Sequence, residues 1–151
     1  MVRHYIGIDP GKNGGIALLD EEGPIEYTVM PDTVAGVYDW LSSLATSLTN
    51  AAMVIEMAQP MPKQGVVSVF TYGRHFGAFE VLARAFGIPY HEVRPAVWKK
   101  AMGLSSDKVD SIQLCQRLFP SANLTPDRCR KPHDGMAEAI LVAEWGRRQR
   151  L

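Results

Sequence analysis

The chain has 151 residues, 46% hydrophobic and 21% charged, which is enough to bury the core of one domain without staples. No run of about 18 apolar residues occurs, and Asp9 interrupts the first apolar run too early for a signal peptide, so we expect neither a membrane span nor a leader. Cys115 and Cys129 lack any zinc-site spacing. We therefore expect a reducing cytoplasm. The length leads us to expect a single domain over residues 1–151.

The net charge of zero conceals an uneven distribution along the chain. Residues 1–90 contain five Lys and Arg against nine Asp and Glu, a balance of −4, whereas residues 91–151 contain eleven against seven, a balance of +4. An acidic half and a basic half can fold into a carboxylate centre surrounded by cations, which keeps a nucleic-acid partner open. The alternative is a plain solvated surface.

The first part of the chain predicts three short strands joined by tight turns. The segment Arg3–Asp9 alternates and ends at Pro-Gly, Ile16–Leu19 follows a Gly-Gly turn, and Ile25–Met30 follows a Glu-Glu-Gly-Pro turn. Strands at this spacing indicate an antiparallel meander.

Helices and strands then alternate. Apolar residues three and four apart predict a helix over 33–48, capped by Asp32 or Thr33, and the apolar run Ala51–Met57 predicts a buried strand. The remaining predicted elements are a helix over 66–86, a strand over 88–93, and helices over 109–119 and 136–145. This order predicts an α/β fold with a mixed five-stranded sheet, three antiparallel strands plus two parallel, and helices on both faces.

Two acidic residues stand at predicted strand ends. Asp9 ends the first strand, where it is either a turn former before Pro-Gly or a metal ligand. Glu56 interrupts the most apolar strand, where a lone buried charge is costly, unless it is an ordinary exposed strand-end residue. The right-handed crossover rule places these strands side by side. Their carboxylates then converge and require a compensating cation.

A third acidic element lies near the C-terminal helix. Asp134 and Glu138 are four residues apart, so they share one helix face, which continues into the apolar Leu141 and Val142. This favours an inward-facing site, although Asp134 as a helix cap and Glu138 as a solvent-facing residue is the alternative. Four hard oxygen donors without a Cys/His pattern favour magnesium, or manganese in its place, over zinc. Two such ions, about 3.5–4 Å apart, hydrolyse phosphodiesters.

These motifs resemble those of RuvC-type Holliday junction resolvases, particularly their phage-like relatives. The resemblance rests on Ile6–Gly11 (IGIDPG), Val54–Glu56 (VIE), Trp98–Lys100 (WKK) followed by Lys108, and His133–Ala139 (HDGMAEA), which occur in the family's order over nearly the whole chain. It implies an RNase H-like fold, a homodimer, and symmetric magnesium-dependent nicking of four-way DNA junctions. It also implies that the catalytic and metal-binding carboxylates are Asp9, Glu56, Asp134 and Glu138, and that Lys108 approaches the scissile phosphate.

The chain departs from the family pattern at three points. The last acid is Glu138 rather than the usual Asp, and it follows Asp134 by four residues instead of three. His133 is an alternative contributor that we leave outside the core set, because an isolated His before a helix is more often a cap. The loop after Glu56 has no aromatic residue to probe the junction centre; Phe70 or Tyr72 are alternatives, although both fit helical core packing.

Basic residues around the predicted acidic edge are candidates for phosphate contacts, which position a nuclease on branched DNA. They are Lys63, Arg74, Lys99, Lys100, Lys108, Arg128, Arg130 and Lys131. The C-terminal Arg147, Arg148 and Arg150 either contact DNA or complement the helix dipole. The helix over 66–86 is a candidate dimer contact, with monomer core as the alternative.

Other functions remain open at this point. An RNase H-type or YqgF-like nuclease acting on RNA or an RNA–DNA hybrid needs the same acids. An actin-like or sugar-kinase domain shares the Asp-x-Gly turn but needs a second phosphate loop and usually a chain of about twice this length. A junction-binding protein without catalysis needs no four placed acids.

Overall fold

The computed structural model describes residues 2–151, in which five strands form one sheet in the order β3-β2-β1-β4-β5. The strands are β1 (His4–Asp9), β2 (Gly15–Leu19), β3 (Pro24–Val29), β4 (Ala51–Glu56) and β5 (Tyr90–Val93). The pairs β1–β2 and β2–β3 are antiparallel, whereas β1–β4 and β4–β5 are parallel. The predicted mixed sheet is confirmed, and so is the position of β4 beside β1.

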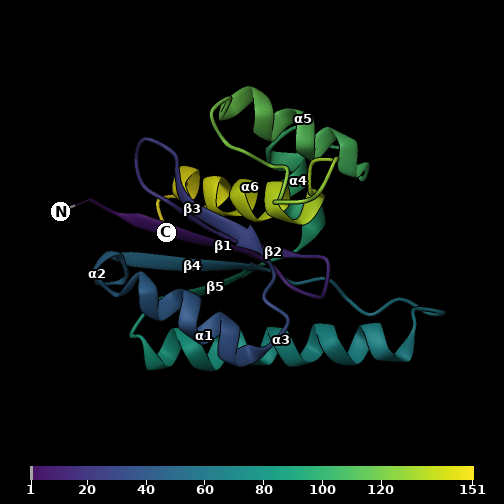
Figure 1. Ribbon diagram of the computed structural model, residues 1–151, viewed down its shortest axis with the longest axis horizontal. Coiled ribbons are helices and arrows are strands. Elements are labelled where there is room, and N and C mark those ends of the chain that lie inside the picture. Colours follow the sequence, from purple (N-terminus) through teal and green to yellow (C-terminus); the bar gives the residue numbers. More distant parts are fainter. Residues whose placement is uncertain (1) are drawn as a thin grey trace.

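Helices cover both faces of the sheet (Figure 1). One face carries α1 (Val34–Ser43) and α3 (Val66–Ala85), with the short α2 (Ala45–Leu48) at the end of α1. The other face carries α4 (Pro95–Ala101), α5 (Lys108–Leu118) and α6 (Asp134–Gln149), with α6 lying directly on the strands. This is the layered α/β arrangement that the element order predicts.

Side-chain alternation along the strands divides the core of residues 2–151 into two clusters. On β1, Ile6 and Ile8 point to the face of α1 and α3, whereas Tyr5 points to the face of α6. On β4, Ala52 and Val54 also point to the α6 face. Because successive strand residues point to opposite faces, Asp9 and Glu56 belong to the α6 face as well.

Glycines allow α6 to approach the sheet at backbone distance. A Cβ placed on Gly7 of β1 would lie 2.0 Å from the Ala139 carbonyl oxygen, and one on Gly135 of α6 would lie 2.2 Å from the Asn13 carbonyl oxygen. Gly15 of β2 meets the Gly135 carbonyl in the same way, at 2.7 Å. No side chain other than hydrogen fits these contacts, so the start of α6 is pressed against β1, β2 and the turn between them.

Several boundaries differ from the predicted ones. The helix predicted over 33–48 breaks at Leu44 into α1 and α2, and α6 begins at Asp134, two residues earlier than predicted, with the His133 side chain as its cap. The sequence pattern missed α4 entirely, because a helix of seven residues that begins with a proline is too short to show helical periodicity.

Helix α3 is buried along only part of its length. Phe79 and Ala83 pack in the core, whereas Val66, Val67 and Phe70 near its start are 69–84% exposed. Figure 1 shows this end of α3 extending beyond the sheet. No helix within residues 2–151 is both long enough and apolar enough to cross a membrane.

The close contact of α6 with β1 predicts that Gly7→Ala destabilises the protein by about 2 kcal/mol or more, since the new methyl group forces two backbones apart. The melting temperature should fall by about 2–4 °C for each kcal/mol in a chain of this size. Gly77→Ala is the matched control, because nothing lies within 4 Å of a Cβ there and alanine favours the helix. An unchanged melting temperature for Gly7→Ala would contradict the contact.

Candidate active site

The register of the sheet brings Asp9 and Glu56 together. Ile8 of β1 pairs with Ile55 of β4, so the next residues along these parallel strands are Asp9 and Glu56. Neighbouring strands lie about 4.7–4.9 Å apart, and both carboxylates point to the α6 face. Glu56 is buried, with 7% of its surface exposed, and Asp9 is partly exposed at the strand end.

Helix α6 adds the third carboxylate. Glu138 is 3% exposed and lies on the turn of α6 that packs against β1. Among the residues that the structure describes, Asp9, Glu56 and Glu138 each offer a carboxylate oxygen, and these oxygens lie within 4.8 Å of one another. Three acidic residues from distant parts of the sequence therefore form one cluster, the carboxylate cluster, at the carboxyl ends of β1 and β4.

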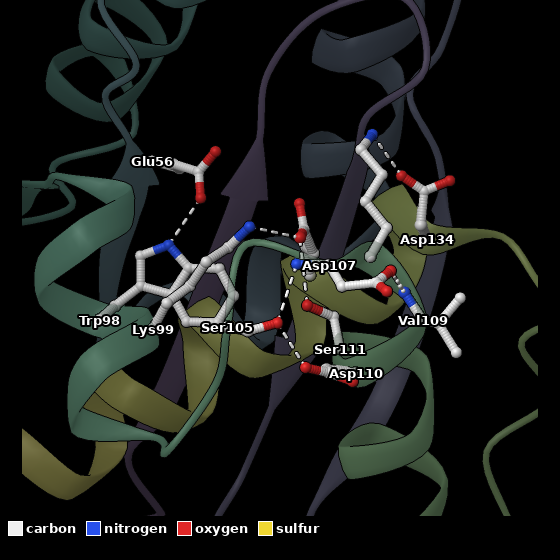
Figure 2. Close-up of polar contacts among 11 residues, drawn as sticks. Glu56, Trp98, Lys99, Ser105, Asp107, Val109, Asp110, Ser111 and Asp134 are labelled. Atoms are coloured by element: carbon white, nitrogen blue, oxygen red, sulfur yellow. Dashed lines mark hydrogen bonds and ion pairs between the residues drawn. The ribbon is translucent and has the colours of Figure 1, made fainter.

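Aromatic side chains hold Glu56 from two elements. The Trp98 indole Nε1–H of α4 donates to Glu56 Oε2 at 2.6 Å, as Figure 2 shows. The Tyr72 hydroxyl of α3 donates to the Glu56 carbonyl oxygen at 3.0 Å and accepts from the Ala58 N–H at 2.8 Å. Both the carboxylate of Glu56 and the backbone that carries it are thus fixed.

Glu138 is held by a cation and a hydroxyl. Lys99 Nζ lies 2.8 Å from Glu138 Oε1, and the Ser111 hydroxyl donates to the same oxygen at 3.1 Å. The Lys99 ammonium also lies 5.4 Å from the centroid of the Trp98 ring, in range of a cation–π contact. The short helix α4 therefore presents adjacent donors to two different acids.

Asp134 lies at the edge of the carboxylate cluster rather than within it. Its carboxylate pairs with Lys108 Nζ at 2.6 Å, and both side chains are partly exposed. Lys108 and Asp9 line a cleft of about 230 Å³ between the β1–β2 turn and the start of α3, with Gln64, Ser68 and Tyr72 on the α3 side. The predicted face shared by Asp134 and Glu138 is present, but only Glu138 reaches the tight group of oxygens.

Burial and like charges perturb the acids. Burial raises the pKa of Asp9 well above its ordinary value, and the carboxylates of Glu56 and Glu138 raise it further, whereas Lys108 opposes this effect. Burial also raises the pKa of Glu56, against the hydrogen bond from Trp98. The hydrogen bond to Asp134 raises the pKa of Lys108. The folded site therefore brings together more negative charge than the nearby lysines neutralise.

This donor set fits a hard divalent cation. Carboxylate oxygens from three residues converge, and no His or Cys joins them in the cluster found among the described residues. Oxygen-only ligands favour magnesium or manganese. Asp9, Glu56 and Glu138 would hold the ion.

The predicted DNA-contacting residues lie in different surroundings. Lys99 is largely buried within the site and paired with Glu138, whereas Lys108 is 63% exposed at the cleft. The others are exposed on the β4–α3 loop, α3, α4 and the loop before α6: Lys63, Arg74, Lys100, Arg128, Arg130 and Lys131. Arg147 and Arg148 pair with the buried Glu144 at the end of α6.

Sequence reasoning missed Trp98, Ser111 and Tyr72 as contacts of the acids. Only Trp98 carried a signal, as an aromatic residue beside the Lys-Lys pair in a segment that was not assigned to a helix. His133 caps α6, because its Nδ1 accepts from the Met136 N–H at 3.1 Å.

Solved structures share this architecture. Two structures of RuvC from T. thermophilus, one in complex with a Holliday junction substrate, match with TM-scores of 0.68 and 0.69 over 97% of this chain and 96% of theirs. The chain has the RuvC fold. Sequence identity to both is 16%, and neither a protein-family model nor a curated protein matches the sequence. The predicted RNase H-like class is confirmed.

A further solved structure shares this fold with a lower score. The large terminase nuclease from the thermophilic phage G20c matches with a TM-score of 0.50 and 13% identity, over 94% of this chain and 81% of that one.

The raised pKa of Asp9 predicts a pH-dependent stability in metal-free buffer. The folded state binds the Asp9 proton more tightly than the unfolded chain, so this group's stabilising contribution is lost as the pH rises from the unfolded pKa through the raised folded one. Asp9→Asn removes the charge and should raise the melting temperature, more at about pH 8 than at about pH 5.

At the higher pH, added Mg²⁺ should reverse the order of the two melting temperatures. It binds and stabilises the wild type but stabilises the Asn variant little. Differential scanning fluorimetry with chelator or Mg²⁺ measures both effects. A Mg²⁺-dependent stabilisation that is equal in the two proteins would exclude Asp9 as a ligand.

Proposed function

We propose that this chain is a divalent-metal-dependent endonuclease that resolves four-way DNA junctions by hydrolysing phosphodiester bonds. The single observation that carries the proposal is the carboxylate cluster of Asp9, Glu56 and Glu138 at the strand ends of the RuvC fold. Acids buried at such proximity are costly for the folded protein, so a cation-dependent role explains them better than a structural one.

The acids and Lys108 have different roles in the proposed reaction. Asp9, Glu56 and Glu138 would hold one magnesium ion, and Asp134, which is close enough to raise the pKa of Asp9, is the remaining carboxylate for a second. When bound, such ions supply an activated water and neutralise charge on the leaving oxygen. Lys108 stands at the open cleft beside Asp9, where its ammonium can orient a backbone phosphate.

The exposed cations extend this site into a DNA-binding surface. Three of them lie close in the chain to parts of the site: Lys63 is in the loop after β4, Lys100 follows Lys99, and Lys131 comes shortly before Asp134. Phosphate contacts from these residues, and from Arg74, Arg128 and Arg130, would place a strand across the cleft without reading its sequence. For Lys99, which pairs with Glu138 inside the site, we propose a role on that carboxylate.

We further propose a homodimer. The exposed apolar side chains Val66, Val67 and Phe70 near the start of α3 are of the kind that interfaces cover. A two-fold dimer matches a junction with approximate two-fold symmetry, because each active site then faces one of two opposed strands.

The test is incubation with a synthetic four-way junction, a fork, a linear duplex and an RNA–DNA hybrid, each with and without Mg²⁺. We expect metal-dependent paired nicks in the junction and little cutting of the linear duplex. Preferential cutting of the hybrid would identify an RNase H-type enzyme instead, and preference for the duplex would indicate an activity unrelated to junctions.

Asp9→Asn and Glu56→Gln should still bind the junction but cut it at least about 100-fold more slowly, since each removes a metal contact. Asp39→Asn is the matched control, because it makes the same acid-to-amide change at an exposed position of α1, on the opposite face of the sheet. Undiminished cutting by either site variant would remove that residue from the mechanism.

A further inference from the structure

Trp98 makes a contact that core packing alone does not require. Its side chain is fully buried, and its indole N–H donates to the buried Glu56 carboxylate at 2.6 Å. Figure 2 shows the indole nitrogen directed at one carboxylate oxygen, while the second oxygen points away from the ring. An N–H donated to a charged acceptor forms a stronger hydrogen bond than one to a neutral group, so this contact fixes the orientation of the acid.

The backbone holds Trp98 in register with Glu56. Val93 of β5 pairs with Glu56, and the Met57 N–H donates to the Val93 carbonyl oxygen at 2.8 Å. Helix α4 starts at Pro95, one residue beyond the end of this strand, and its proline favours the first helical turn. The chain thus pairs with Glu56 at the end of β5, and the helix that follows directs the Trp98 side chain back to the Glu56 carboxylate.

We infer that Trp98 is a positioning residue of the proposed metal site, which holds the Glu56 carboxylate so that its remaining lone pairs face Asp9 and Glu138. An ionised carboxylate offers about four acceptor positions, and the indole N–H occupies one of them. The neighbouring Lys99 donates to Glu138, whereas Trp98 donates to Glu56. The inference rests on the proposed function, since it assigns a role within that metal site.

The test is calorimetric titration of the full chain with Mn²⁺, without DNA. Trp98→Phe removes the donor but keeps a ring, and we expect its Mn²⁺ affinity to fall about 10-fold or more. A tryptophan analogue with sulfur in place of Nε1–H, introduced at position 98, keeps the shape of the side chain and should show the same loss. This second variant keeps the test valid if phenylalanine impairs folding.

Two comparisons separate positioning from packing. Met102→Ala opens a cavity at the end of the same helix, where Met102 is buried, and should leave Mn²⁺ affinity near the wild-type value. In a Glu56→Gln background, Trp98→Phe should cause no further loss, because Trp98 acts through the missing carboxylate.

Equal Mn²⁺ affinity in the wild type and both position-98 variants would overturn the inference. An equal loss with Met102→Ala, or an undiminished effect of Trp98→Phe in the Glu56→Gln background, would overturn it as well, because either would show a general packing effect. A wild-type chain that binds no Mn²⁺ would contradict the proposed function, and with it the inference. Weakened Mn²⁺ binding in the position-98 variants, with near-wild-type binding in Met102→Ala, would support the inference and the proposed function.

Discussion

The site depends on the side-chain-free contact between α6 and the sheet. Gly7, Gly15 and Gly135 let backbone meet backbone, so that α6 lies closer to β1 and β2 than it could with side chains between them. Glu138 thereby enters the space between the ends of β1 and β4. Without this close approach, Asp9 and Glu56 would form a pair of neighbouring acids, and the Glu138 carboxylate would be too far from them to join the cluster.

That approach has an electrostatic consequence. Burial raises the pKa values of Asp9 and Glu56, and repulsion from the neighbouring carboxylates raises them further. Lys99 and Lys108 each pair with one acid of α6, and Trp98 donates to Glu56, whereas the Asp9 carboxylate has no ion pair within residues 2–151. The four acids outnumber the two lysines, and a divalent cation at the proposed site would offset the remaining negative charge.

Sequence periodicity was sufficient for part of this arrangement. Asp9 and Glu56 could be predicted as neighbours because alternation identified their strands and crossover handedness placed those strands side by side. The shared face of Asp134 and Glu138 followed from their spacing. Conversely, α4 is too short to show a helical period, so the inward direction of Trp98 and Lys99 was not predictable, and Lys99 was assigned to the DNA surface. The glycine contacts depend on tertiary packing that no local pattern encodes.

The central claim is that Asp9, Glu56 and Glu138 form one cation-binding pocket. Anomalous diffraction from crystals of the protein grown with Mn²⁺ tests it most directly, because the scattering locates the ion without assumptions about activity. The account predicts an anomalous peak bonded to carboxylate oxygens of all three residues. A well-diffracting crystal with no peak at this position, or with the only peak bound elsewhere, would contradict it.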